Sequence, residues 1–200
     1  MAITKDDIAR GKSTIEETLN TTVIGYGYPS STYGALGEYD YQKYLYETGH
    51  KYAVWCSTKG TESTVPDLED KYWINGSYRF TNDNIVLASA DYASNTDTEL
   101  SWFFATGHAF DVYVDGELTS NFTSFVNNLG ERDDIYYATN GDLITYLLDS
   151  KKVAMPQTFI AGTRIVNTTN TTLYYNAIDE NGNTLNTYAL EPGASILMTD

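Results

Sequence analysis

The C-terminal part of the chain limits the possible folds more strongly than any other segment. Four short apolar runs follow one another there, at residues 165–166, 173–178, 185–190 and 196–198. The segments between them are rich in Asn, Asp, Gly and Pro, the residues that tight turns require. Runs of this length and regular spacing are typical of antiparallel strands. The pattern predicts a C-terminal β-meander, and Pro192-Gly193 predicts a type II turn.

Residues 71–115 show further strand signals. Asn75-Gly76 and Asp115-Gly116 each lie between apolar residues, and such pairs accept the positive φ angles of a two-residue hairpin turn. Ile85–Ala90 and Leu100–Ala105 are compact apolar runs, which we interpret as buried strands. We therefore expect a mainly β fold with a few short α-helices, of the α+β class, whose antiparallel sheets form a sandwich-like body.

Three segments have the apolar spacing of amphipathic helices. The first covers residues 4–19, begins with a capping box at Thr4–Asp7 and is weakened by Gly11. The second is Leu118–Leu129, with a Thr or Ser available to cap its start. The third covers residues 142–152, where an acidic start and a basic end suit the helix dipole.

Residues 20–60 have a different character. The stretch from Gly25 to Gly34 is rich in Gly, Tyr and Ser, so it combines backbone freedom with aromatic contact surface. We interpret it as an extended arm that lies along a neighbouring subunit, and the alternative is a long loop packed on its own domain. The contact residues of this arm would be Tyr26, Tyr28 and Tyr33.

The organisation of the chain predicts three domains, and the chain contains one cysteine. The expected domains are an N-terminal helix and Tyr/Gly-rich arm (1–65), an α+β core (66–157) and a C-terminal β module (158–200). Because Cys56 is the single cysteine, the chain can form neither an internal disulfide nor a cysteine cluster for a metal.

Charge and aromatic content narrow the range of partners. The formal net charge is −15, and a charge of this size repels phosphate backbones and anionic lipids. Nucleic acid and membranes are therefore not expected partners. The 18 tyrosines suit protein interfaces, because each ring carries a polar tip, although aromatic residues also fit pleated sheets.

The N-terminal residues carry no recognisable export signal. Met1–Asp7 lack the apolar segment of a secretory signal peptide, and no apolar run reaches the length of a transmembrane helix. We expect synthesis in a cytoplasm without a standard secretion route. The Asn-x-Ser/Thr sequons are therefore expected to stay unglycosylated, and they begin at Asn20, Asn75, Asn121, Asn167 and Asn170.

Each candidate for catalysis or metal binding has a simpler structural explanation. No Gly-x-Ser-x-Gly elbow accompanies either histidine, His50 or His108. Asp179–Asn183 offers oxygen ligands for calcium but has the composition of a turn and lacks the full EF-hand spacing. The carboxylates that a glycosidase would need lie at turns and in loops: Asp111, Asp115, Glu117, Glu131, Asp133 and Asp134. We expect no enzyme activity, no metal and no cofactor.

Two C-terminal runs carry a resemblance to a known group of proteins. They are Arg164–Tyr175, with the sequence RIVNTTNTTLYY, and Glu191–Ser195, with the sequence EPGAS. Together with the acidic, Asn-, Thr- and Tyr-rich β composition, they resemble small β modules in the virion proteins of tailed bacteriophages. The resemblance implies a structural protein of the virus particle, of the capsid decoration, head-fibre or tail-accessory type. Such a protein is a homo-oligomer that binds other virion proteins and is located in the virion.

Two other functional classes are compatible with the sequence. One is a receptor- or glycan-binding module of a fibre, for which aromatic side chains would form a stacking platform unless they lie in the core: Tyr72, Trp73, Tyr78 and Trp102. The other is an unrecognised carbohydrate-active enzyme. A binding module should expose an aromatic patch, and an enzyme should contain a deep pocket with convergent ionisable groups. The Tyr/Gly-rich arm favours assembly over both.

Overall fold

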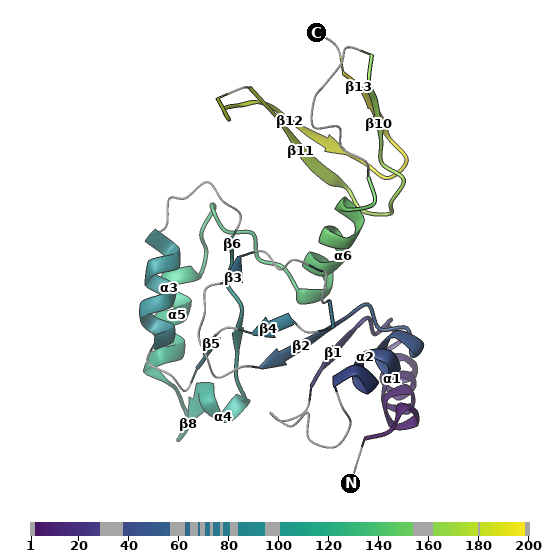
Figure 1. Ribbon diagram of the computed structural model, residues 1–200. Coiled ribbons are helices and arrows are strands. Elements are labelled where there is room, and N and C mark those ends of the chain that lie inside the picture. Colours follow the sequence, from purple (N-terminus) through teal and green to yellow (C-terminus); the bar gives the residue numbers. More distant parts are fainter. Residues whose placement is uncertain are drawn as a thin grey trace. The chain divides into compact units, whose positions relative to one another are not determined.

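The computed structural model divides the chain into two compact units, Met1–Tyr137 and Ala138–Asp200 (Figure 1). This division differs from the three predicted domains, because the last helix hydrogen-bonds to the C-terminal strands and belongs with them. The structure describes the following residues: 3–28, 38–56, 63–64, 68, 71–72, 74–76, 78–80, 84–94, 101–153, 162–179 and 181–198.

The first helix, α1 (Lys5–Leu19), confirms the prediction for residues 4–19. Its capping box is formed: Thr4 Oγ1 accepts a hydrogen bond from the Asp7 N–H (3.2 Å), and Asp7 Oδ2 accepts one from the Thr4 N–H (3.1 Å). The helix continues through Gly11 without a break and ends at Asn20, whose φ of 48° is left-handed.

A three-stranded sheet in the first unit is parallel, which corrects the expectation of antiparallel sheets. Strand β2 (Tyr52–Cys56) pairs in parallel with β1 (Gly25–Gly27) on one side and with β4 (Ile74–Gly76) on the other. Helix α2 (Glu38–Glu47) lies between β1 and β2 in the chain and supplies the long crossover that parallel pairing requires.

Helices α1 and α2 bury a small core together with this sheet (Figure 1). Its buried members are Ile8 of α1, Tyr41 and Leu45 of α2, and Ala53 of β2. Gly25 permits the close packing of β1, because a Cβ at this position would lie 2.4 Å from the Tyr52 ring. The residues flanking the crossover are therefore part of a folded β-α-β unit.

The predicted hairpin at Asn75-Gly76 is wrong. Strand β4 pairs with β2, while the next strand, β5 (Tyr78–Arg79), pairs in parallel with β7 (Ala105–Thr106). Part of the predicted strand Leu100–Ala105 is strand β6 (Ser101–Trp102). It pairs antiparallel with a second short strand, β3 (Ser63–Thr64). The dipeptide permits a turn, but β4 and β5 on its two sides pair with β2 and β7 and not with each other.

The predicted strand Ile85–Ala90 is also wrong, because these residues lie in helix α3 (Asn84–Ser94). Ile85 and Ser89 are buried at a spacing of four residues, as on one helical face. A short apolar run is compatible with either structure, and here helical packing against α5 (Ser120–Leu129) decides it. Figure 1 shows the two helices side by side.

Helix α5 confirms the prediction for residues 120–129, whereas Leu118 lies in a strand. The helix is capped by Thr119, whose hydroxyl accepts a hydrogen bond from the Phe122 N–H. Its inner face joins a cluster of aromatic rings. Phe122 and Phe125 lie edge-on to Phe80 at centroid distances of 5.3 and 5.2 Å, and Phe125 also contacts Phe103 at 5.8 Å. This cluster forms a second core of the first unit.

The hairpin predicted at Asp115-Gly116 is confirmed. Strands β8 (Tyr113–Val114) and β9 (Glu117–Leu118) pair antiparallel across these residues, whose φ angles are 52° and 89°. The alternating pattern before the turn does not extend the strand, because the short helix α4 (Ala109–Val112) precedes it.

The second unit contains the predicted third helix, α6 (Asn140–Ser150), and the four predicted C-terminal strands. The strands are β10 (Arg164–Val166), β11 (Leu173–Ile178), β12 (Thr184–Leu190) and β13 (Ser195–Leu197). Their pairing is not that of a meander: β11 and β12 form a hairpin, whereas β10 pairs with β13. The predicted sandwich is likewise not confirmed, because the described strands form small separate sheets.

The turns of this unit follow the sequence chemistry. Gly193 has a φ of 74°, and the Ala194 N–H donates to the Glu191 carbonyl (2.9 Å), as expected for a type II turn at Pro192-Gly193. Asn167 is completely buried after β10 and directs the chain into β11. A cluster of buried apolar residues fills the centre of the unit: Val153, Ile165, Leu173, Leu190 and Met198.

Candidate functional sites

Two of the three tyrosines predicted to form an assembly arm pack against their own unit. Tyr26 and Tyr28 form an edge-to-face pair at 5.6 Å, and Tyr28 makes a similar contact with Tyr41. The Tyr28 hydroxyl also donates to the Tyr72 carbonyl (2.7 Å). The described part of residues 20–60 is therefore folded as strands and a helix and is not an extended arm. Tyr33 lies outside the described residues, and an intersubunit contact of these tyrosines stays a prediction.

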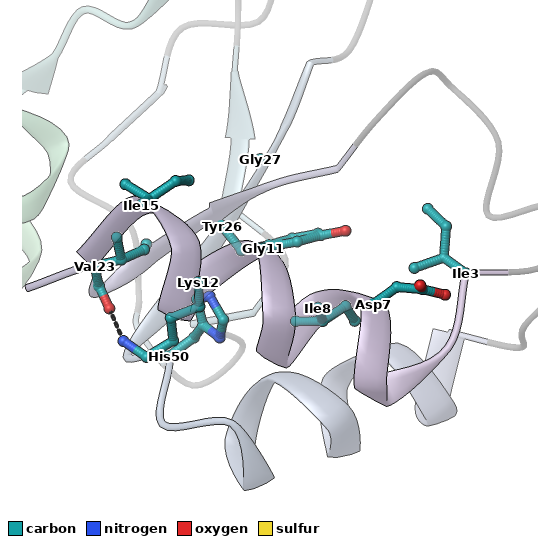
Figure 2. A pocket seen from close by; sticks show the side chains of 11 residues that line it. Ile3, Asp7, Ile8, Gly11, Lys12, Ile15, Val23, Tyr26, Gly27 and His50 are labelled. Atoms are coloured by element: carbon teal, nitrogen blue, oxygen red, sulfur yellow. Dashed lines mark hydrogen bonds between the residues drawn. The ribbon is translucent and has the colours of Figure 1, made fainter. Parts of the chain in front are cut away.

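A pocket of about 380 Å³ lies between α1 and β1. Aliphatic side chains form its walls, among them Ile3, Ile8, Ile15 and Val23. Figure 2 shows Lys12 and His50 at one end and Asp7 with Ile3 at the other, with the Tyr26 ring between them. The sequence analysis missed this pocket. The available signal was Gly11, a glycine inside an amphipathic helix, which we interpreted as a weak point of the helix.

His50 is the deepest ionisable group of the pocket, with 4% of its surface exposed. Its ring lies edge-on to Tyr26 at 5.6 Å, and its Nδ1 lies 2.9 Å from Thr48 Oγ1. Burial lowers the pKa of the imidazole, and the nearby Lys12 ammonium lowers it further. His50 is therefore neutral near pH 7.

His108 has a structural role at the start of α4. Asp111 Oδ2 accepts hydrogen bonds from the His108 N–H (2.8 Å) and lies 3.1 Å from its Nδ1. The hydrogen bond from the His108 backbone is the main cause of the lowered pKa of the Asp111 carboxyl. The His108 ring stacks on Phe110 at 4.5 Å. The backbone contact forms a helix cap, and the contact with Nδ1 holds the His108 ring beside the Asp111 carboxylate.

The other candidate carboxylates are occupied or exposed. Asp134 pairs with Arg132 (2.7 Å), while Asp115 and Glu117 are exposed at the β8–β9 hairpin. Asp179 accepts hydrogen bonds from the backbone N–H groups of Asn181 and Asn183, each at 2.8 Å, so its turn satisfies it internally. Within the described residues, no three His, Cys, Asp or Glu side chains come together as a metal site.

The aromatic residues proposed as a sugar platform contact different neighbours. The Tyr72 hydroxyl donates to the His50 carbonyl (2.9 Å), Tyr78 stacks on Phe103 at 4.8 Å, and Trp102 stacks on Phe104 at 5.1 Å. Trp73 lies outside the described residues. The described rings are half-buried, in agreement with a core role.

The β11–β12 hairpin presents a set of exposed apolar side chains, which we call the hairpin patch: Tyr174, Ile178 and Leu185. Their exposed fractions are 59%, 58% and 69%. In β11 the exposed residues alternate with the more buried Leu173, Tyr175 and Ala177, so one face of the strand packs on the core and the other does not. In Figure 1 strands β11 and β12 diverge from the β10–β13 pair as they extend away from α6.

The edges of this hairpin are only partly covered. Within the described residues, β11 and β12 form a two-stranded sheet without a third strand. The Tyr146 hydroxyl of α6 accepts from the Tyr174 N–H (3.3 Å) and donates to its carbonyl (3.4 Å), so it covers β11 at that residue. Beyond Tyr174 the strand edge offers backbone groups that can pair with another strand.

Comparisons of the chain with protein-family models, curated proteins and solved structures find no match. Its candidate sites therefore depend on its own residues and geometry. Among the described helices, none combines the length and the apolar character that crossing a membrane requires.

Proposed function

We propose that this protein is a structural component of a virus particle, of the head or tail accessory type found in tailed bacteriophages, and that it acts by protein–protein assembly. The observation that carries the proposal is the hairpin patch of Tyr174, Ile178 and Leu185. Exposed apolar groups gathered on one element favour contact with a protein surface, because burial removes them from water.

The second unit has a small buried core and also exposes several large apolar side chains. Its buried cluster contains five apolar residues. Among the described residues of the same unit, five large apolar side chains are exposed: Val166, Tyr174, Ile178, Leu185 and Leu197. An isolated two-stranded hairpin is only marginally stable in water, so docking on a partner would stabilise this part of the chain.

The partner that fits the hairpin patch best is a second copy of the chain. Neither β11 nor β12 contains a charged residue, so two copies of the hairpin can approach without like charges between the strands. Residues 138–200 contain three Lys or Arg and six Asp or Glu, whereas residues 1–137 contain nine and 21. Self-association through the second unit therefore meets less charge repulsion than through the first.

Sedimentation velocity of the purified full-length chain over a concentration series tests this proposal. The wild-type chain should form a dimer or a higher oligomer. Leu185→Lys should weaken association at least about tenfold, because it replaces a buried apolar contact with a charge. Circular dichroism should show that the variant is folded, since Leu185 is exposed in the single chain.

Leu87→Lys is the matched control. Leu87 is a leucine of α3 with 67% of its surface exposed, close to the 69% of Leu185, but it lies in the first unit. This variant should associate like the wild type. A chain that stays monomeric at every concentration, or equal association of both lysine variants, would contradict the proposal.

A further inference from the structure

The pocket between α1 and β1 is open because glycines form part of its wall. Nothing lies within 4 Å of the position that a Cβ would take at Gly11 or Gly27. The volume of about 380 Å³ falls in the range of small-molecule sites. The aliphatic walls at Ile3, Ile8 and Val23 offer no hydrogen bonds to water, so an apolar group is the better occupant.

His50 provides a hydrogen-bond acceptor at one end of the pocket. The Thr48 hydroxyl has one proton, which it donates to the Tyr44 carbonyl (2.7 Å), so toward His50 Nδ1 it is an acceptor. We therefore assign the proton of the neutral ring to Nδ1, which leaves a lone pair on Nε2. Among the hydrogen bonds of the described residues, none engages His50 Nε2.

The charged groups of the pocket already have partners. Lys12 Nζ pairs with Glu16 (2.7 Å) and also donates to the Val23 carbonyl. Asp7 pairs with Arg10 (2.7 Å) and accepts from Thr4. An anion would meet the His50 lone pair and the Asp7 carboxylate, whereas a cation would meet Lys12. An uncharged ligand avoids both the repulsion of an anion by Asp7 and the repulsion of a cation by Lys12.

We infer that this pocket binds a small uncharged hydroxyl compound, with its apolar body between α1 and β1 and its hydroxyl donating to His50 Nε2. The Tyr26 ring lies edge-on to His50 and forms one side of the pocket, so a flat ring can lie against it (Figure 2). This site is separate in function from the hairpin patch, and neither proposal depends on the other.

A matched pair of probes tests the inference on the full-length chain. The probes are 4-propylphenol, which has a hydroxyl donor, and 4-propylanisole, in which a methyl group replaces the hydroxyl proton. Titrations followed by ¹H–¹⁵N NMR should shift the amide signals of Gly11, Gly27 and His50. The phenol should bind about tenfold more tightly than the ether, because the ether covers His50 Nε2 without donating a hydrogen bond to it.

Three variants separate the hydrogen bond from the cavity. His50→Phe should abolish the preference for the phenol while the ether still binds. Gly11→Leu should abolish binding of both probes, because its side chain enters the open space, while circular dichroism shows an intact helix. Ala9→Leu, at an exposed position of the same helix, should bind both probes like the wild type. Unchanged glycine signals in the wild type, or normal binding by Gly11→Leu, would overturn the inference.

Discussion

The buried side chain of Asn167 makes four hydrogen bonds within the second unit. Asn167 Nδ2 donates to the carbonyls of Thr171 (2.8 Å) and Leu190 (2.7 Å). Its Oδ1 accepts from the Thr169 N–H (3.0 Å) and hydroxyl (2.7 Å). The amide thus joins the turn after β10 to the end of β12.

Replacing Asn167 with Ala should destabilise the second unit by about 2 kcal/mol or more, because buried carbonyl and amide groups lose their partners. Hydrogen exchange of the amides in residues 164–198 measures the change. Asn176→Ala is the control, since Asn176 is an exposed amide of β11 that accepts one hydrogen bond from Thr187 (2.8 Å). Equal losses of protection in the two variants would argue against a special role of Asn167.

His50 should make stability depend on pH. Its pKa in the folded chain is lowered by burial, whereas in the unfolded chain it is about 6.5. The unfolded state therefore binds more protons below neutral pH, and the free energy of unfolding should fall as the pH drops from about 7 through 6.5. The facing carboxylate, Glu16, has a lowered pKa and stays charged throughout this window.

Urea unfolding at several pH values between about 7 and 5.5 tests this dependence. His50→Gln, which does not titrate, should show a shallower decrease of the unfolding free energy than the wild type. The same slope in both proteins would show that other groups cause the dependence.

At the scale of elements, the sequence predicted what local chemistry determines. The capped helices α1, α5 and α6 and the β8–β9 turn were found because caps and turn residues lie next to each other in the chain. Strand partners depend on distant residues, so the Asn75-Gly76 hairpin and the C-terminal meander were not found. Ile85–Ala90 was assigned to a strand because its apolar run lacks a decisive period.

For the candidate sites too, the sequence revealed local features but not those formed by residues far apart in the chain. The sequence predicted the strand at residues 173–178 but not which of its side chains are exposed, because LYYNAI has no alternation of apolar and polar residues. The pocket was not visible, because it forms where α1 meets a parallel strand that the sequence did not reveal. Tyr26 and Tyr28 were predicted to contact a neighbouring subunit, and the contacts that the structure contains lie within their own unit.

Two glycines of the first unit should respond in opposite directions to alanine. Gly25→Ala should destabilise the unit by about 1–3 kcal/mol, because its Cβ would overlap the Tyr52 ring. Gly11→Ala should stabilise it by about 1 kcal/mol, because the methyl group meets open space and alanine favours the helix. Chemical denaturation of the two variants measures both changes. Destabilisation by Gly11→Ala would contradict the open pocket wall.

At the scale of the whole molecule, charge and exposed apolar surface are unevenly distributed between the two units. Most of the net charge of −15 resides in residues 1–137. A surface with so much negative charge favours solubility and disfavours contact between copies. The second unit carries little net charge and exposes the hairpin patch. We therefore propose that the second unit makes the assembly contact and that the first unit remains accessible on the assembled particle.

Quantitative mass spectrometry of virus particles purified from cells that produce this chain tests the central proposal most directly. The proposal predicts that the chain is present in a constant copy number per particle and remains bound through density-gradient purification. Particles in which the chain is absent, or present only at the level of contaminating host proteins, would contradict it.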